Sequence, residues 1–272
     1  MKKNISFPIT LVITTYNWKE ALELVLLSIF GQTVFPDEIV IADDGSHTDT
    51  KELIDRMRKD SPVPLVHIWQ EDKGFRLSKI RNKAIAAATS EYIIQIDGDC
   101  VLEKHFIQDH LEMAQPGTYV CGSRACCSEE FSKKWLNTKR FYYREFRSVK
   151  GSSLNRFRVG FLRKHVMKKF PITIKGCNMA FWRSDILAVN GYDESYEGWG
   201  YEDHDLALRL DNLGIRRRTL KMGAVMYHLF HREKDSDLLS DEYRHRMRKL
   251  AFLREHKEVV RAEDGLDKYL RE

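Results

Sequence analysis

Two aspartates, Asp97 and Asp99, are separated by a single glycine at the end of an apolar run. Residues 91–96 read as a buried strand, and because burial excludes unpaired carboxylates, both side chains are expected at the strand's carboxyl end. That edge of an open α/β sheet is where ligands bind. Two carboxylates around a glycine can face one hard cation while the backbone passes close to a ligand. A solvated turn is the alternative interpretation.

A second group of acids lies in the C-terminal half, after two glycines that flank a tryptophan. The segment is Gly198, Trp199, Gly200, Tyr201, Glu202, Asp203, His204 and Asp205. The glycines allow a tight backbone that presents a large ring to a ligand. Acids favour helix N-termini, which explains Asp205 without any function. That preference does not explain the Gly-Trp-Gly sequence.

Residues 9–99 alternate β-branched runs with segments of helical periodicity. Strands are expected at residues 9–15, 38–42, 65–69 and 91–96, with a helix at 78–88 before the last of them. Asn17 and Glu20 have the spacing of a capping box for the first helix, and Thr48 is the expected cap of the second. The alternation predicts an α/β fold with a parallel, doubly wound, Rossmann-like sheet and right-handed crossovers.

The pattern after Asp99 is less regular. The expected elements are a strand at 118–122, a loop at 126–130, a strand led by Gly176 at 175–181, a helix at 184–189, a helix through Leu206 and Leu210 that ends at Gly214, a strand at 219–226, and a charged helical tail from 241.

Charge is distributed unevenly along the chain. The overall net charge is +5, yet residues 133–169 carry 13 Lys and Arg against one acid, Glu145, interleaved with aromatic residues. This segment could face anionic lipid head groups or a lipid-diphosphate acceptor, could bind nucleic acid, or could be a mobile loop with a solvated helix. A membrane surface is favoured over nucleic acid because no nucleic-acid motif accompanies the charge, so no nucleic-acid partner is expected.

Composition narrows the cellular setting. No apolar run reaches the length of a membrane-spanning helix, and the first residues carry no signal-peptide pattern. The five cysteines include no C-x-x-C pair, so free thiols are expected and a zinc site is not. We expect a cytoplasmic protein that is peripheral at the inner face of the cell membrane.

Five short motifs occur in an order and spacing that resemble family 2 glycosyltransferases of the GT-A fold. They are Thr14-Thr15-Tyr16-Asn17, Gln32-Thr33, Asp43-Asp44-Gly45-Ser46, Arg81-Asn82-Lys83-Ala84 and Asp97-Gly98-Asp99. The resemblance covers about the first 125 residues, and its specificity comes from the ordered set.

The resemblance implies a site for a UDP-sugar donor. It is formed by Thr14, Tyr16, Asp43, Asp44, Arg81, Asp97 and Asp99, with Thr14, Tyr16 and Asp44 near the nucleoside, Asp97 near the ribose and Asp99 on a divalent metal. Carboxylates suit the imide N–H of uracil and the ribose hydroxyls. Arg81 would pair with these acids or with the diphosphate, and a solvated helix face is its alternative. No P-loop or dinucleotide fingerprint is present, so a metal is expected to hold the phosphates.

The second acidic group resembles the G-W-G-x-E-D-x-D motif of β-1,4-galactosyltransferases and of bacterial chondroitin polymerases. The match implies that Asp203 is the catalytic base, that Glu202 is its neighbour in the catalytic pair, and that Trp199, Gly200 and Tyr201 contact the acceptor. Tyr201 replaces the glycine of those galactosyltransferases and would reshape the sugar pocket.

Two histidines, His228 and His231, follow the strand expected at 219–226. Those galactosyltransferases place a metal-binding histidine here, and His231 matches its spacing, while His228 stands where they have a methionine. A structural role is the alternative for either residue. With Asp99, an oxygen and imidazole shell would suit Mn²⁺, or Mg²⁺ instead.

Together these features predict one GT-A domain with an acceptor-side C-terminal part. Residues 1–125 would bind the nucleotide sugar, 126–171 would form the membrane or acceptor surface, 172–236 would hold the acceptor and metal site, and 237–272 would be a helical tail. The predicted activity is metal-dependent, inverting transfer of a hexose or N-acetylhexosamine from a UDP-sugar to a saccharide or lipid-linked saccharide in surface glycan synthesis. The alternatives are a non-catalytic nucleotide-sugar or membrane-binding module and a glycoside hydrolase; a nucleotidyltransferase is weaker still.

Overall fold

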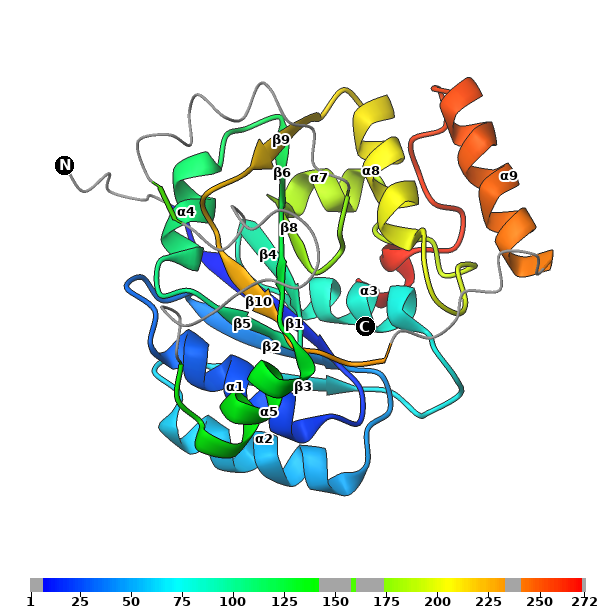
Figure 1. The fold of residues 1–272 in the computed structure, drawn as a ribbon. Helices are drawn as coiled ribbons and strands as arrows, with labels where there is room; N and C mark the ends of the chain where they lie inside the picture. Colours follow the sequence, from blue (N-terminus) through cyan, green and yellow to red (C-terminus); the bar gives the residue numbers. More distant parts are fainter. Residues whose placement is uncertain (1–6, 142–157, 160–173, 233–240, 271–272) are drawn as a thin grey trace.

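A computed structural model describes residues 7–141, 158–159, 174–232 and 241–270 (Figure 1). Its main feature is a sheet of seven strands in the order β3-β2-β1-β4-β8-β6-β9. The strands are β1 (Ile9–Thr15), β2 (Glu38–Asp43), β3 (Leu65–Trp69), β4 (Tyr92–Asp97), β6 (Thr118–Gly122), β8 (Asn178–Trp182) and β9 (Arg216–Leu220). Only β8 runs antiparallel to its neighbours within this sheet. The expected mostly parallel α/β sheet is therefore confirmed.

A second, smaller sheet has three strands in the order β5-β10-β7. These are β5 (Cys100–Leu102), β7 (Ala125–Cys126) and β10 (Met226–His228). The single strand expected at 219–226 is wrong, because the chain leaves the large sheet after Leu220 and enters the small one at Met226. Met222 and Ala224, between the two strands, have positive φ angles of 57° and 41°, which an extended strand does not allow. The loop expected at 126–130 is also partly wrong, since a helix begins at Glu129.

Helices cover both faces of the large sheet, and α5 and α9 pack outside this layer against α1 and α8. The described helices are α1 (Lys19–Phe30), α2 (Thr48–Asp60), α3 (Leu77–Ala87), α4 (Phe106–Met113), α5 (Glu129–Thr138), α7 (Arg183–Ala188), α8 (Glu202–Asn212), α9 (Asp241–Glu255) and the 3₁₀ helix η2 (Leu266–Tyr269). In the described part of the chain, no helix is both long enough and apolar enough to cross a membrane.

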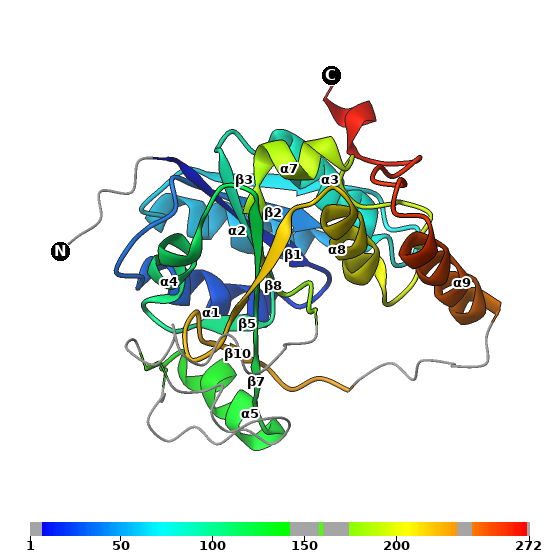
Figure 2. The same cartoon turned by 90° about the horizontal axis from the view of Figure 1, so that it is seen from above.

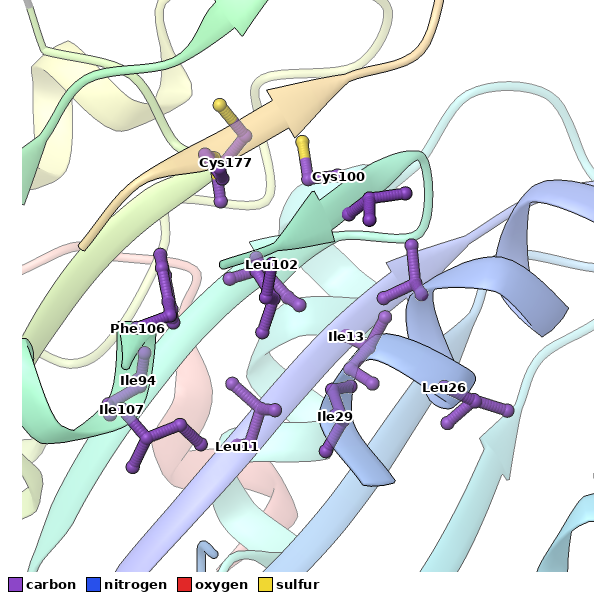
Figure 3. Close-up of a cluster of buried hydrophobic side chains, with 14 of the residues drawn as sticks. Leu11, Ile13, Leu26, Ile29, Ile94, Cys100, Leu102, Phe106, Ile107 and Cys177 are labelled. Carbon is purple, nitrogen blue, oxygen red and sulfur yellow. The ribbon is translucent and has the colours of Figure 1, made fainter. Parts of the chain in front are cut away.

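Side-chain alternation along the strands supplies both cores. Leu11 and Ile13 of β1 pack with α1 and α4 in one cluster, which Figure 3 shows in close-up. Val12, on the opposite face, packs in a second cluster with residues of α3, α7 and α8. Because successive side chains of a strand point to opposite faces, a strand covered on both faces has consecutive apolar residues in its interior, as Leu11, Val12 and Ile13 show.

The helix starts differ from the capping predictions. Asn17 does not cap α1, since its side-chain oxygen accepts the backbone N–H of His47 at 2.9 Å. Trp18 occupies the N-cap of α1 and His47 that of α2, neither with a side-chain cap, so Thr48 is the first helical residue. Asn17 thus ties the loop after β1 to the loop after β2, a tertiary contact that replaces the local one.

A buried asparagine, Asn178 at the start of β8, connects the two sheets. Its side-chain amide donates to the carbonyls of Ser123 and Ala224, and its oxygen contacts His110 Nε2 at 2.9 Å. Gly122 lies so close that a Cβ there would overlap the Asn178 amide group. The fold therefore depends on a glycine at this position.

We expect Gly122→Ala to lower the free energy of unfolding by about 1–3 kcal/mol, the cost of overpacking a closed core site. Urea denaturation measures the effect. Gly31→Ala is the matched control, since a Cβ there meets nothing closer than 3.7 Å, and we expect a change within about 0.5 kcal/mol. Equal stabilities of the two variants would contradict this account of the junction.

Candidate active site

The strand order reverses between β1 and β4, which makes the carboxyl ends of these strands the expected ligand crevice. Thr14 and Asp97 are register partners at this point, and the Thr14 hydroxyl donates to Asp97 Oδ1 at 2.7 Å. Arg81 of α3 donates to the same oxygen at 3.1 Å. The structure therefore brings together three of the residues predicted to bind the donor.

Arg81 also reaches the C-terminal half of the chain. Its second terminal nitrogen donates to Glu202 Oε1 at 3.0 Å, and the guanidinium lies over the ring of Tyr192. Arg81 is 1% exposed, so the solvated helix face considered from the sequence is wrong. A Cβ at Gly176 would lie 3.0 Å from this guanidinium, so only glycine leaves it room there.

Glu202 and Asp203 are adjacent carboxylates in different environments. Burial and the neighbouring charge of Asp203 raise the pKa of Glu202. Burial also acts on Asp203, but the hydrogen bond with His204 and the charge of Arg81 bring the pKa of Asp203 below its ordinary value. Such a separation leaves one acid ready to ionise and the other ready to hold a proton.

Both oxygens of Asp203 have partners. The backbone N–H of Gly176 donates to Oδ2 at 2.8 Å, and His204 Nδ1 lies 2.7 Å from Oδ1. Gly176 precedes β8 by two residues, so the glycine-led segment predicted to line the site does so just before its strand begins.

Asp99 follows β4 and faces two imidazoles. Its Oδ2 is 3.4 Å from His228 Nε2 and 3.3 Å from His231 Nε2. Gly98 lets the chain between Asp97 and Asp99 pass close to β1. Its N–H donates to the Thr14 carbonyl at 2.7 Å, and a Cβ at this position would lie only 2.9 Å from that oxygen. Although burial opposes it, His228 and His231 lower the pKa of Asp99 to about 2.

The two histidines differ in protonation tendency. Burial lowers the pKa of His228, whereas the hydrogen bond with Asp99 raises the pKa of His231. Cys100 is the other nearby donor, within 4.8 Å of the donor atoms of Asp99 and His228, but burial raises its pKa well above the ordinary value and keeps the thiol protonated.

The two contacts of Asp99 have the spacing of metal ligands. Ligand atoms that share one octahedral ion at about 2.1 Å lie about 3 Å apart, which is close to the separation of Asp99 Oδ2 from each imidazole nitrogen. In the described residues, the donor atoms that all lie within 4.8 Å of one another belong to Asp99, Cys100 and His228. A carboxylate with imidazole suits Mn²⁺, and a protonated thiol adds no ligand for a hard cation.

The remaining predicted donor-site acids bind their own chain. Asp43 accepts the N–H of Ser46 at 2.8 Å and lies 3.0 Å from His67. Asp44 is bound by the side chain of Gln70 and by the backbone of Arg76, and burial raises its pKa. These contacts hold residues 70–76 against the sheet edge.

Tyr16, in the loop after β1, is 49% exposed. Its hydroxyl donates to Asp72 Oδ2 at 2.9 Å, which joins this loop to residues 70–76. Tyr16 therefore presents its ring beside Asp44 at the same edge of the sheet as Thr14.

The Gly-Trp-Gly segment forms a left-handed loop before α8. Gly198, Gly200 and Tyr201 have φ angles of 78°, 102° and 77°, and Trp199 is 59% exposed. The positive angles at positions 198 and 200 favour glycine, which explains why the helix preference for acids could not account for this segment. Tyr201 holds such an angle at a cost of about 1–3 kcal/mol. Its ring lies against His204 and against Tyr243 of α9.

Helix α9 lies alongside α8 (Figures 1 and 2) and fastens this loop. Arg246 donates to the carbonyls of Trp199 at 2.7 Å and Glu197 at 2.5 Å. The sequence pattern of the tail indicates no chemical role. It also does not distinguish Arg246, His204 or Asp72, because no regular spacing along the chain marks an isolated charged residue whose partners are distant or unknown.

The sheet order, its single antiparallel strand and the ligand edge define the GT-A class of fold. Residues 10–187 match the model of glycosyl transferase family 2, and residues 159–232 match the N-terminal domain of galactosyltransferase. The chain belongs to glycosyl transferase family 2.

Curated relatives include chondroitin synthase from Escherichia coli, 24% identical over 81% of this chain, and validoxylamine A glucosyltransferase from Streptomyces hygroscopicus, 26% identical over 76%. The chain spans 34% and 48% of the lengths of these two proteins.

Solved structures show the same fold. TarS residues 1–349 from S. aureus, in complex with UDP, aligns with a TM-score of 0.64 at 16% identity, covering 96% of this chain and 68% of that one. Mannosyltransferase PcManGT from Pyrobaculum calidifontis, in complex with GDP-Man and Mn²⁺, aligns at 0.57 and 15% identity, covering 97% and 73%.

We expect Arg81→Met to lower the free energy of unfolding by about 3–5 kcal/mol at pH 7, because it leaves the buried carboxylate of Glu202 without its counter-ion. The loss should shrink at pH 5, since burial raises the pKa of Glu202 and the folded variant therefore binds a proton there more tightly than the unfolded chain does. Urea denaturation at both pH values measures it. Arg56→Met, which breaks an exposed pair with Glu23, should cost under about 1 kcal/mol. Equal losses would show that the Arg81 bridge contributes little.

Proposed function

We propose that this chain transfers a hexose or N-acetylhexosamine from a UDP-sugar to a saccharide or lipid-linked saccharide acceptor, with inversion at the anomeric carbon. The observation that carries the proposal is that Arg81 joins Asp97, at the carboxyl end of β4, to Glu202, at the start of α8 beside Asp203. Membership of glycosyl transferase family 2 supports it, as do the names of relatives that polymerise or transfer sugars.

On the donor side, Thr14, Tyr16, Asp43 and Asp44 would surround the nucleoside and Asp97 would receive the ribose. Tyr16 supplies an exposed aromatic face for the base, and the carboxylates supply acceptors for its N–H and for the sugar hydroxyls. Arg81 would act through Asp97 and Glu202, because both of its terminal nitrogens are bound to these acids. It would therefore position the donor site and leave the diphosphate to other groups.

Asp99, His228 and His231 would hold Mn²⁺ or Mg²⁺. Bound there, the cation would supply positive charge to the departing nucleoside diphosphate, so no protein general acid would be needed. The complex of PcManGT, which has the same fold, with GDP-Man and Mn²⁺ supports the use of a divalent cation.

On the acceptor side, Asp203 would be the base. The acceptor hydroxyl attacks the anomeric carbon from the face opposite the diphosphate, its proton passes to Asp203, and the bond to the diphosphate breaks with its electron pair. Trp199 would stack on the acceptor sugar, with Gly200 and Tyr201 shaping its edge and Glu202 beside the base. A single displacement of this kind inverts the configuration.

Residues 126–171, the basic segment proposed to face an anionic membrane, lie largely outside the described part of the chain. Within that range the structure describes 126–141 and 158–159, and it gives Arg158 a two-point ion pair with buried Asp109. Peripheral attachment at the cytoplasmic face of a membrane stays a proposal that rests on the basic composition.

We expect Mn²⁺ and UDP together to raise the melting temperature more than either alone, since a ligand at about 100 times its Kd adds roughly 2.7 kcal/mol. Thermal shift with a panel of nucleotide sugars measures this and identifies the donor. Asp99→Asn and His231→Gln should remove the Mn²⁺-dependent part, while His256→Gln, just after α9, should retain it. A Mn²⁺ effect that survives both of the former substitutions would exclude this corner as the metal site.

We expect Asp203→Asn to lower kcat by about 100-fold or more, the scale of general-base catalysis, with the donor-induced thermal shift retained. A radiolabelled-sugar transfer assay measures kcat. The control is Asp211→Asn on the same helix, whose carboxylate accepts the Tyr119 hydroxyl, and it should keep its activity. Near-normal turnover in Asp203→Asn would reject this base.

The wild type distinguishes the alternative functions. Donor binding without any transfer would favour a binding module, and hydrolysis without nucleotide sugar would favour a hydrolase.

A further inference from the structure

Arg124, directly before β7, faces the metal corner, by which we mean Asp99 and the two imidazoles beside it. In the small sheet, His228 of β10 is the register partner of Cys126 on β7 and of Cys100 on β5. Register partners on neighbouring strands project from the same face of a sheet, and so do residues two apart along one strand. Arg124 precedes Cys126 by two residues, so its side chain leaves the face that carries His228.

A contact with Cys177 agrees with this placement. The Arg124 guanidinium donates to the Cys177 sulfur at 3.8 Å, and Cys177 lies beside Cys100. Cys177 also follows Gly176, whose backbone N–H donates to Asp203. Arg124 therefore reaches from the metal corner to the segment that binds the proposed base.

The charge of Arg124 acts on both imidazoles of the metal corner. Burial lowers the pKa of His228, and the positive charge of Arg124 lowers it further. The hydrogen bond with Asp99 raises the pKa of His231, and Arg124 opposes that rise. A guanidinium stays protonated throughout the working pH range, so this charge is permanent. A positive charge that disfavours a proton on these nitrogens also disfavours a cation held by them.

The charges at the metal corner do not balance for a divalent cation without nucleotide. Asp99 supplies one negative charge, while Asp97 is already bound by Thr14 and Arg81. A divalent cation beside Arg124 would therefore leave an excess of positive charge. A diphosphate has the opposite charge and oxygens for both groups, since guanidinium and phosphate form paired, charge-assisted hydrogen bonds.

We propose that Arg124 binds the donor diphosphate and makes cation binding at the metal corner depend on it. The guanidinium weakens the binding of a cation without nucleotide and strengthens the binding of a cation together with nucleotide. Because Arg81 is bound to Asp97 and Glu202, the diphosphate would take its guanidinium contact from Arg124. Linkage is reciprocal, so the cation and the nucleotide each raise the affinity for the other. The inference rests on the proposed function, since it takes a UDP-sugar as the donor.

Calorimetric titration with Mn²⁺ alone tests the first half of the inference. Arg124→Gln should bind Mn²⁺ more tightly than the wild type, by about 5-fold or more, because the repelling charge is gone. Arg124→Lys keeps the charge and should retain the weaker binding. The matched control is Arg218→Gln, which removes a partly buried guanidinium bound to the carbonyl of Met113, and it should match the wild type.

Titration with UDP and with uridine in the presence of EDTA tests the second half. The wild type should bind UDP more tightly than uridine without any metal, by about 5-fold or more, because the guanidinium contacts the diphosphate. Arg124→Gln should lose most of this difference and keep its affinity for uridine. The wild-type comparison holds even where a variant fails to fold.

The outcomes separate this inference from the proposed function. A structural role for Arg124 would lower the affinities of Arg124→Gln for Mn²⁺ and for uridine together. Weaker or unchanged Mn²⁺ binding by Arg124→Gln overturns the inference, as does equal affinity of the wild type for UDP and uridine without metal. Sugar transfer by the wild type then leaves the proposed function in place. Absence of both UDP binding and transfer by the wild type overturns the proposed function as well.

Discussion

One buried guanidinium holds the two halves of this protein in register. Arg81 enters from α3 and binds Asp97 of the N-terminal half and Glu202 of the C-terminal half, with almost no exposure to water. A charge in this environment is stable only while its partners stay in place, and the partners are stable only while the charge is there. The same contact therefore stabilises the fold and sets the distance between the carboxyl end of β4 and the start of α8.

The small sheet positions the side chains that are proposed to bind the metal. His228 of β10 is the register partner of Cys100 on β5, which places its ring beside Asp99 at the preceding position. His231 then returns to the same carboxylate from the loop beyond the strand. The pairing of β10 with β5 thus places His228 beside Asp99, whereas His231 reaches the same carboxylate from the loop that follows β10.

The proposed acceptor side is built differently, from a strained loop and a helix that fastens it. Glycines at positive φ fold the backbone around Trp199, Tyr201 accepts a similar angle, and Arg246 of α9 binds two carbonyls of the loop. Strain of this kind persists only where surrounding contacts over-determine it. Helix α9, which lies outside the acidic motif, therefore holds the backbone that carries the exposed indole of Trp199.

The amino-acid sequence by itself determined the strands of the first half, the carboxylates at the end of β4, and the loop and acids before α8, because these depend on local periodicity and on the backbone freedom of glycine. It misassigned Asn17 as a cap and residues 219–226 as one strand, since a hydrogen bond to His47 and a change of sheet are tertiary events. Only the tertiary structure decided that Arg81 is buried between acids, that Asp43 and Asp44 bind their own chain, and that His204 touches Asp203. Those outcomes depend on which polar side chains lie within about 3 Å of one another in the folded protein, and the spacing of residues along the chain does not predict such contacts.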